Sequence, residues 1–302
     1  MIEARDLRFT RSGRARAQAA ISFKTRRELA PDARAMAHVY VHGYSPRETE
    51  RLADQAAILR PLLHDGVAFP AGSRVLEPGC GTGEQTAALL AGSPGIRITA
   101  LDVDGAQLAR ARAAVSPAAA VDFIVADLVT APLASHGFDH AFVCFLLEHL
   151  VEPSAALAVL RRVVKPGGIV VVIEGDHGSC RFHPETGAAR AVWEALSVCQ
   201  RRLGGDPDIG RRLHGLLRAA GLTDVTVEPR MVYADAGSVA LRDGFVRRII
   251  VPMVQGAREP ALAAGIVDAT TWDRGIAELT ATADGLEGSF CYTFFRARAR
   301  NP

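Results

Sequence analysis

The stretch Arg74-Val75-Leu76-Glu77-Pro78-Gly79-Cys80-Gly81-Thr82-Gly83 decides the fold of this chain. A short apolar run ends in an acid, glycine then occupies every second position, and the residues from Glu84 to Leu90 have the pattern of a helix. Alternating glycines let a chain turn sharply and approach a ligand closely, because they carry no Cβ. A strand that stops where a helix starts also leaves backbone N–H groups free at one edge of a sheet. The pattern therefore predicts a nucleotide-type binding site.

The spacing of the glycines separates two classes of nucleotide site. A dinucleotide fingerprint, G-x-G-x-x-G, would need its third glycine at position 84, but Glu84 stands there and the third glycine comes one position earlier. This spacing disfavours a nicotinamide-dependent oxidoreductase. The observed E-x-G-x-G-x-G resembles motif I of the class I S-adenosylmethionine (AdoMet)-dependent methyltransferases. The resemblance implies AdoMet as cofactor, S-adenosylhomocysteine as product, and cofactor contacts from Glu77, Gly79, Cys80, Gly81 and Gly83, although a small buried filler is the better interpretation of the Cys80 thiol.

The composition of the whole chain narrows the class of protein further. At 302 residues, 49% hydrophobic and 23% charged, it is typical of a soluble globular protein. A net charge of +2 indicates neither a nucleic-acid footprint nor a membrane-binding face. The 5 cysteines are scattered without metal-ligand spacing, which favours free thiols in the reducing cytoplasm and no metal site. We interpret the Arg-rich residues 5–27 as a partly ordered leader and not as a targeting peptide.

Strand and helix patterns alternate along most of the chain. A helix is expected over 46–64, and apolar runs of strand length follow it, several of them continuous, as in strands buried on both faces. We therefore predict an α/β fold with a doubly wound, mostly parallel, seven-stranded sheet of the Rossmann-like methyltransferase type. The predicted divisions are a leader and helical lid over 1–64, a cofactor-binding core over 65–233 with a helical insertion at 184–204, a helical substrate cover over 234–288, and a last core strand over 289–302.

The residues that end successive strands form a second test of the site, because ligands bind outside the carboxyl ends of strands in such sheets. Asp102 ends the second strand, where a carboxylate can accept hydrogen bonds from both ribose hydroxyls, and Val103 can lie against the adenine. Asp127 ends the third strand, with Leu128 beside it, and Cys144-Phe145 ends the fourth. These positions match the methyltransferase motifs in order. Taken singly, Asp127 could instead cap a turn, and Asp102 could be an ordinary acid next to a helix that Asp104 caps.

The fifth strand is expected to end at Glu174-Gly175-Asp176-His177, where it would meet the methyl acceptor. Methyl transfer needs positioning and desolvation, and it needs a base only when the acceptor must lose a proton. Glu174 and His177 are the candidate acid/base residues, and His149 resembles a histidine often found after the fourth strand in this superfamily. The alternatives are that Glu174 pairs with an arginine, that His177 caps a turn, and that His149 is a structural histidine.

Two residues before the first strand are candidates by analogy with bacterial methyltransferases whose N-terminal helical segment covers AdoMet. On that analogy Tyr44 and Gln55 contact the methionine carboxylate or the substrate, whereas the alternative interpretation makes Tyr44 a packing aromatic.

The sequence thus predicts a methyltransferase that acts on a small, apolar or aromatic metabolite, of the bacterial natural-product type. It lacks the Asn/Asp-Pro-Pro-aromatic tetrad of base-amino DNA methyltransferases after its fourth strand, and no basic stripe is present. The alternatives are an AdoMet-binding protein without transferase activity and, less favoured, an NAD-dependent oxidoreductase. The acceptor atom (oxygen, nitrogen or carbon) stays open, and a homodimer is possible.

Overall fold

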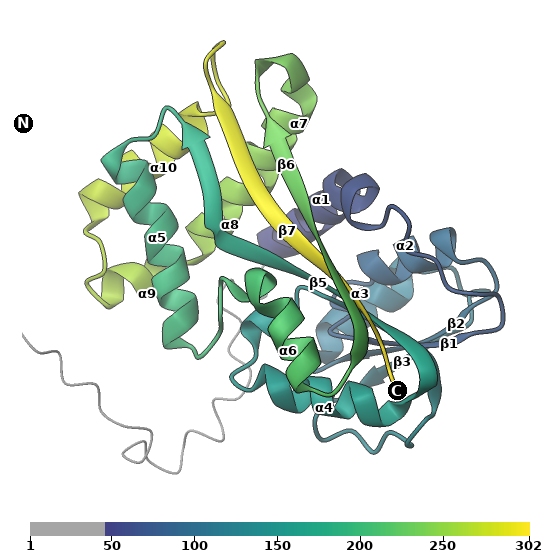
Figure 1. Ribbon diagram of the computed structural model, residues 1–302. Coiled ribbons are helices and arrows are strands. Elements are labelled where there is room, and N and C mark those ends of the chain that lie inside the picture. The colour runs from purple at the N-terminus through teal and green to yellow at the C-terminus, as the bar shows by residue number, and fades with distance from the viewer. Residues whose placement is uncertain (1–45) are drawn as a thin grey trace, which may run out of the picture. The chain divides into compact units, whose positions relative to one another are not determined.

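The computed structural model describes residues 46–302, and its centre is one seven-stranded sheet (Figure 1). The expectations for the leader and for Tyr44 lie outside the described residues. The strand order is β3-β2-β1-β4-β5-β7-β6. The strands are β1 (Arg74–Pro78), β2 (Arg97–Asp102), β3 (Val121–Val125), β4 (Phe138–Cys144), β5 (Val164–His183), β6 (Thr223–Ala234) and β7 (Ser289–Arg300).

The strand pairing determines where on the sheet a ligand can bind. β1 lies between β2 and β4, and the pairs β1–β2, β2–β3, β1–β4 and β4–β5 are all parallel. β7 is inserted antiparallel between β5 and β6. The chain winds outward in opposite directions from β1 and β4, and ligands bind at such a switch point, outside the carboxyl ends of the strands. The predicted fold class, a doubly wound, mostly parallel sheet, is confirmed.

Helices cover both faces of the sheet, as Figure 1 shows. Neighbouring residues of β1 show the division: Val75 belongs to one buried apolar cluster and Leu76 to the other. One cluster holds side chains of α1, α2, α3 and α5, and the other those of α4 and α6. These helices are α1 (Pro46–Leu63), α2 (Glu84–Gly92), α3 (Gly105–Ala114), α4 (Pro153–Val163), α5 (Gly187–Arg202) and α6 (Leu213–Ala219), with the short 3₁₀ helices η2 (Leu147–His149) and η3 (Ile209–Arg212) between them.

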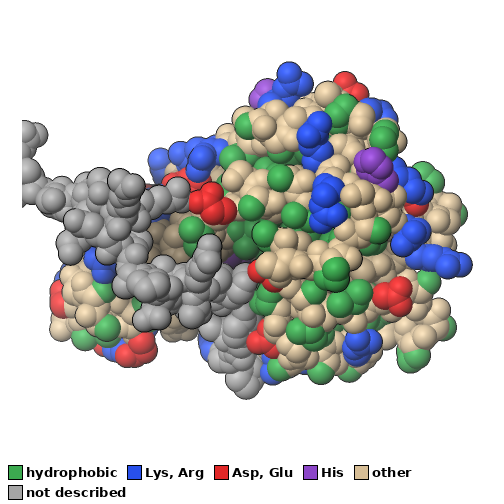
Figure 2. Space-filling model, turned by 90° about the horizontal axis from the view of Figure 1, so that it is seen from below, with side chains coloured by type: hydrophobic (Ala, Val, Ile, Leu, Met, Phe, Trp, Pro, Cys, Tyr) green, Lys and Arg blue, Asp and Glu red, His purple; other side chains and the backbone are tan. Residues whose placement is uncertain are grey.

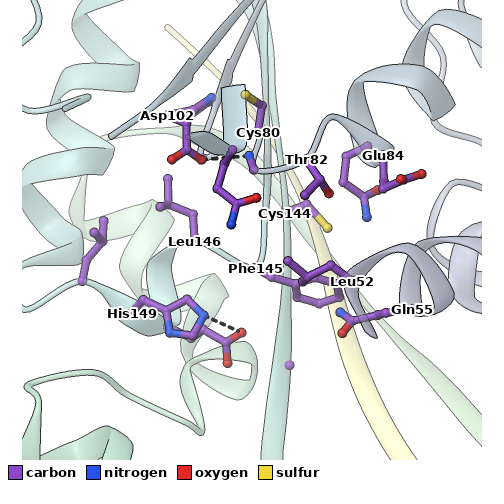
Figure 3. A pocket seen from close by; sticks show the side chains of 18 of the residues that line it. Leu52, Gln55, Cys80, Thr82, Glu84, Asp102, Cys144, Phe145, Leu146 and His149 are labelled. Carbon is purple, nitrogen blue, oxygen red and sulfur yellow. Dashed lines mark hydrogen bonds and ion pairs between the residues drawn. The ribbon is translucent and has the colours of Figure 1, made fainter. Parts of the chain in front are cut away.

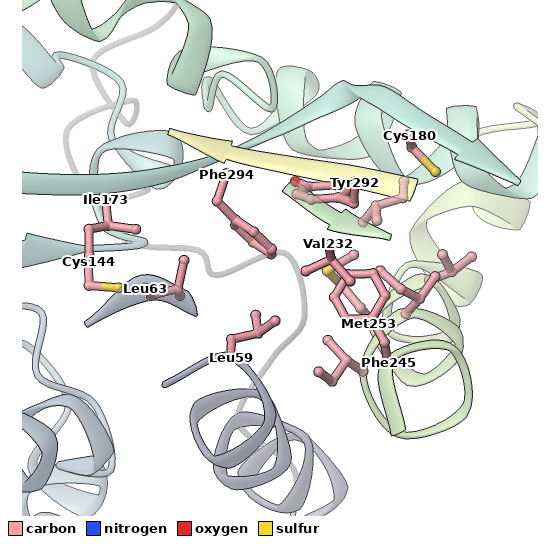
Figure 4. Packing of buried hydrophobic residues seen from close by; sticks show 14 of the residues in the cluster. Leu59, Leu63, Cys144, Ile173, Cys180, Val232, Phe245, Met253, Tyr292 and Phe294 are labelled. Atoms are coloured by element: carbon pink, nitrogen blue, oxygen red, sulfur yellow. The ribbon is translucent and has the colours of Figure 1, made fainter. Parts of the chain in front are cut away.

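A further group of helices fills the chain between β6 and β7. Their buried side chains join the cluster that includes α1 and α5, and Figure 4 shows Phe245 and Met253 facing Tyr292 and Phe294 of β7. One of these helices has the wider π-helical winding, which occurs frequently at functional sites. The elements are η4 (Ala236–Ser238), α7 (Val239–Asp243), the π-helix η5 (Gly244–Ile250), α8 (Val251–Gly256), α9 (Arg258–Ala263) and α10 (Ala269–Ala281).

The fifth strand differs from its prediction. The sequence predicts that it ends at the stretch Glu174-Gly175-Asp176-His177, but β5 continues to His183, because the long strand β7 pairs with it along most of its length. The register shifts between Asp176 and Arg181 and then resumes up to the pair His183–Ser289. The segment around His177 is therefore an irregular part of a strand and not a loop after one.

Two further features of residues 46–302 are the distribution of charge on the surface and the character of the helices. Figure 2 shows acidic and basic side chains mixed with apolar ones on the face in view. Within residues 46–302, no helix combines the length and the apolar character that a bilayer crossing requires.

Candidate functional site

A cavity of 240 Å³ lies where the carboxyl ends of β1, β2 and β4 meet α1 and η5. Figure 3 shows Asp102 and Cys80 on the sheet side, Leu52 and Gln55 projecting from α1, and His149 on another wall. Many of the predicted site residues line it, namely Gln55, Gly79, Cys80, Gly81, Asp102, Val103, Asp127, Leu128, Cys144, Phe145, His149 and His177. Glu77, Gly83 and Glu174 do not line it.

The glycine loop is held in place by the end of the neighbouring strand. Gly79, Gly81 and Gly83 have φ angles of 73°, 51° and 85°, in the left-handed region that favours glycine. The N–H groups of Gly79 and Cys80 donate to the Leu101 carbonyl at 2.7 and 3.0 Å. Gly79 and Gly81 both line the cavity and, without side chains, present their backbone to it.

Gly83 and Glu77 support the loop from behind. A Cβ on Gly83 would lie 2.8 Å from that of Ala111, so this glycine permits α2 to pack against α3. The Glu77 carboxyl is buried and accepts a hydrogen bond from the Thr86 hydroxyl at 2.7 Å. Its burial raises the pKa to about 8, since the Thr86 hydrogen bond only partly offsets the loss of solvation. The sequence assigns both residues to the cofactor, but neither of them lines the cavity.

Asp102 connects β2 to the glycine loop. One carboxylate oxygen accepts from the Gly81 N–H at 2.8 Å and the other from the Asp104 N–H at 2.9 Å. Burial raises the pKa of Asp102, and these backbone N–H groups act against it. Each oxygen can accept a second hydrogen bond, so the carboxylate can still bind hydroxyl groups from the cavity. Asp104 separately caps α3 through the N–H groups of Ala106 and Gln107, so the cap does not depend on Asp102.

The ends of β3 and β4 complete this wall. Asp127 lines the cavity and also accepts from the Val129 N–H at 2.7 Å, so the turn-capping alternative holds together with the predicted position. Phe145 has a φ angle of 54°, and its N–H donates to the Ile173 carbonyl at 2.9 Å. This conformation turns the chain after β4 so that Cys144 and Phe145 both face the cavity. Burial raises the pKa of the Cys80 and Cys144 thiols, which makes both poor nucleophiles.

Helix α1 contributes a buried cation that sequence reasoning missed. Arg51 lines the cavity and makes two hydrogen bonds to the Glu48 carboxylate, at 2.7 and 2.6 Å. It also donates to the Gln55 side-chain oxygen. The available signal was the i, i+4 spacing of Arg51 and Gln55, which places them on one helix face. His149 lies in the same region, and burial, reinforced by Arg51, lowers its pKa to about 4.

Glu174 has a structural role in this arrangement. It is fully buried, and its carboxyl accepts from the N–H groups of Leu147 and Leu146 at 2.7 and 3.1 Å and from that of Glu148 at 3.4 Å. It thereby satisfies the free backbone donors at the start of η2. Burial and the nearby Glu148 raise its pKa well above the ordinary value. The Glu174 carboxyl faces backbone N–H groups and does not line the cavity. We therefore infer that Glu174 holds the loop after β4 in position.

His177 is placed differently. It lines the cavity, and its Nδ1 lies 2.8 Å from the hydroxyl of Tyr292, which lines the cavity as well. Sequence reasoning treated Tyr292 only as part of the last strand, because nothing local indicates which residue of β5 that strand would place beside it. Phe245, Ile249, Ile250, Met253 and Phe294 add an apolar wall at this end. No group of three or more His, Cys, Asp or Glu side chains within residues 46–302 is arranged to hold a metal ion.

Comparisons with known proteins agree with this geometry. Residues 76–172 match the family described as "Methyltransferase domain". An uncharacterized 37.1 kDa protein in transposon TN4556 of Streptomyces fradiae is 30% identical over 76% of this chain and 64% of its own length. The demethylmenaquinone methyltransferase of Renibacterium salmoninarum is 34% identical over 44% of this chain and 52% of its own length. The chain thus spans less than two thirds of either relative.

Solved structures share the fold at low identity. Phosphoethanolamine N-methyltransferase 2 of Haemonchus contortus, solved with S-adenosylhomocysteine, superposes with a TM-score of 0.55 at 15% identity, covering 88% of this chain and 61% of that one. A possible histamine N-methyltransferase of Thermotoga maritima superposes with a TM-score of 0.53 at 16% identity, covering 88% of this chain and 100% of that one.

Proposed function

We propose that this chain, which belongs to the class I AdoMet-dependent methyltransferase superfamily, transfers a methyl group from AdoMet to a small, apolar or aromatic metabolite. The observation that carries the proposal is the cavity itself. It joins the glycine loop and Asp102 to an apolar wall around Phe245 in one continuous space, so that cofactor and acceptor can meet within it.

The residues at the sheet edge fit AdoMet. Asp102 retains acceptor capacity for the ribose hydroxyls, and Val103 presents an exposed apolar side chain beside it. Asp127 and Leu128 line the same cavity, and we assign them to the adenine. Gly79 and Gly81 carry no side chain, and we assign them to the close approach of the methionine part. When bound, AdoMet supplies a methyl group activated by positively charged sulfur. The chain then needs to orient the acceptor and exclude water.

The opposite end of the cavity suits an apolar acceptor. Phe245 and Phe294 lie with ring centroids 6.5 Å apart, and Phe145 lies 5.5 Å from Phe294. Ile249, Ile250 and Met253 extend this surface along η5 and α8. Burying apolar surface contributes about 25 cal/mol per Å² to binding, and a wall of this kind favours an aromatic or alicyclic molecule over a strongly hydrated one.

The remaining features are part of the same proposal. We assign α1 and the helices between β6 and β7 the role of a cover over the acceptor, and we expect a cytoplasmic protein, in keeping with its free cysteines. The partner is a small molecule and not a nucleic acid. A homodimer is compatible with the proposal.

Calorimetric titration of the full-length protein with S-adenosylhomocysteine, beside NAD, tests the cofactor assignment. We expect micromolar binding of S-adenosylhomocysteine alone. Asp102→Ala should abolish it, whereas Asp104→Ala removes a carboxylate two residues away whose role is to cap α3. Equal losses in the two variants, or preference for NAD, would overturn the assignment.

An AdoMet-binding protein without transferase activity is the second candidate. Cofactor binding does not separate it from an enzyme, but turnover does. A screen of aromatic and heterocyclic acceptors with AdoMet, followed by mass spectrometry for a mass gain of one methylene unit, supports the enzyme if any acceptor is methylated. A protein that binds S-adenosylhomocysteine and methylates none of them would favour the second candidate.

A further inference from the structure

Two polar side chains meet inside the apolar end of the cavity. His177 belongs to β5 and Tyr292 to the antiparallel strand β7, and the His177 Nδ1 lies 2.8 Å from the Tyr292 hydroxyl oxygen. Both residues are buried, and both line the cavity. This is hydrogen-bonding distance, so the pair can pass a proton between the hydroxyl and the imidazole.

The backbone around His177 holds the ring in a defined position. Its N–H donates to the Pro207 carbonyl at 2.8 Å, and its carbonyl accepts from the Trp193 indole N–H at 3.0 Å. The Trp193 ring also packs against the imidazole, with centroids 5.2 Å apart. A group that transfers protons benefits from such fixed geometry, because its orientation is not lost between turnovers.

Gly175 provides the space for the hydroxyl. A Cβ at this position would lie 2.5 Å from the Tyr292 hydroxyl oxygen, closer than side-chain carbons approach. Any other residue at 175 would therefore displace the hydroxyl. The absence of a side chain here allows the hydroxyl to occupy its place beside the His177 imidazole.

The surroundings keep the imidazole neutral and ready to accept a proton. Burial lowers the pKa of His177, which leaves the ring uncharged at neutral pH. Glu148 of η2 and Asp208 before η3 favour the protonated ring, whereas His149 of η2 and Arg201 of α5 oppose it. The His177 Nε2 is buried and makes no hydrogen bond within the described residues. Burial raises the pKa of Glu148 itself, and the interaction with His177 acts against that rise.

We propose that Tyr292 and His177 form a proton relay that ionises the methyl acceptor, and that the acceptor is therefore a phenol or an enol, methylated on oxygen. This assignment rests on the proposed methyltransferase function. The acceptor O–H bond breaks as its proton passes to the Tyr292 oxygen, and the Tyr292 proton passes to the Nδ1 of His177. The acceptor oxygen uses the released electron pair to bond to the methyl carbon, while the electron pair of the broken carbon–sulfur bond stays on sulfur. After the product leaves, the Nδ1 proton returns through Tyr292 to water, which resets the pair.

A series of para-substituted phenols of graded acidity, from phenol to 4-nitrophenol, tests the relay. We expect Tyr292→Phe and His177→Gln to lower kcat for the weakly acidic phenols about 100-fold or more, the usual contribution of general base catalysis. The loss should shrink steadily toward 4-nitrophenol, which is the most acidic phenol of the series and gives up its proton with little help. Tyr233→Phe, at an exposed tyrosine of β6, is the matched control.

A binding measurement gives a second readout that does not depend on turnover. The visible absorbance of 4-nitrophenolate reports the ionisation of the bound phenol in the protein with S-adenosylhomocysteine. In the wild type the bound phenol should ionise at lower pH than in Tyr292→Phe or His177→Gln.

The outcomes separate the two proposals. If S-adenosylhomocysteine does not bind, the proposed function fails and the relay fails with it. If S-adenosylhomocysteine binds but no phenol is methylated, or if the variants lose activity equally across the series, the relay is wrong while the cofactor assignment stands. Thermal denaturation of each variant, compared with the wild type, shows whether a uniform loss reflects unfolding.

Discussion

The Asp102 carboxylate accepts a hydrogen bond of 2.8 Å from the backbone N–H of Gly81. This bond joins the end of β2 to the middle of the glycine loop, so one side chain both shapes the loop and faces the cavity. The second carboxylate oxygen is held by the Asp104 N–H. The carboxylate is therefore oriented before any ligand arrives, which lowers the entropic cost of binding.

Asp102→Asn should weaken the binding of S-adenosylhomocysteine about 10- to 100-fold, because hydrogen bonds to a charged group contribute about 1.5–3 kcal/mol. The amide keeps the size of the side chain but has one acceptor atom where the carboxylate has two. Calorimetry measures the affinity, and circular dichroism verifies the fold. Unchanged affinity would show that the carboxylate serves the loop alone.

Gly83→Ala should destabilise the protein more than Gly72→Ala does. Both glycines have left-handed φ angles, 85° and 83°, so an alanine costs about 1–2 kcal/mol at either position. At position 83 the new Cβ also meets the Cβ of Ala111 at 2.8 Å, whereas at position 72 nothing lies within 4 Å. Overpacking should add about 1–3 kcal/mol. Urea denaturation measures both free energies of unfolding, and equal values would contradict the packing of α2 on α3.

Glu174→Gln should preserve both the stability and the pH profile of turnover, because the amide oxygen can still accept from the N–H groups of Leu146 and Leu147. Glu174→Leu should cost about 1–3 kcal/mol for each buried donor left unpaired. Thermal denaturation and kcat measured across pH distinguish the two variants. A folded Glu174→Gln protein without turnover would restore Glu174 to the acid/base role that its sequence position suggested.

Glu77→Gln should change how stability depends on pH. The pKa of Glu77 rises from 4.5 to about 8 on folding, so between these values only the unfolded chain releases this proton. The protonated Glu77 therefore makes its full contribution to the free energy of unfolding below pH 4.5, and this contribution is lost as pH rises through about 8. A glutamine has no proton to release. The free energy of unfolding of the Glu77→Gln protein, relative to that of the wild type, should therefore increase from pH 5 to pH 8.

Urea denaturation of both proteins at three pH values measures this difference. Glu287→Gln, at an exposed site, controls for the loss of one carboxylate. A constant difference between Glu77→Gln and the wild type across the range would show that Glu77 is ionised in the folded protein.

Local patterns were sufficient to predict which strand ends meet at one end of the cavity. The glycine loop, Asp102, Asp127 and Phe145 each lie at or just after the end of a strand, and parallel strands bring their carboxyl ends to one edge of the sheet. Strand boundaries and order therefore place these residues together without any knowledge of side-chain packing. Helix α1 was likewise predicted over nearly its observed range, from its capping residues and apolar spacing.

Position within the cofactor motif did not reveal which residues reach the cavity. Gly83 and Glu77 belong to the motif as closely as Gly79 does, yet they face α3 and Thr86. The consecutive residues from Pro78 to Thr82 line the cavity, whereas Glu77 before them and Gly83 after them do not. The direction of each side chain depends on packing that the motif does not contain.

By itself, the sequence determined the order of strands and helices and the acids at the strand ends, because these follow from local apolar patterns and turn residues. Only the tertiary structure decided which side chains meet at the apolar end of the cavity, where we place the acceptor. Tyr292 stands 115 positions from His177 along the chain, and the antiparallel register of β5 and β7 brings the two together. The same pairing extends β5 beyond Glu174, whose carboxyl faces the backbone of η2 and not the cavity. Strand register depends on contacts summed over whole strands, so no short stretch of sequence encodes which side chains will meet.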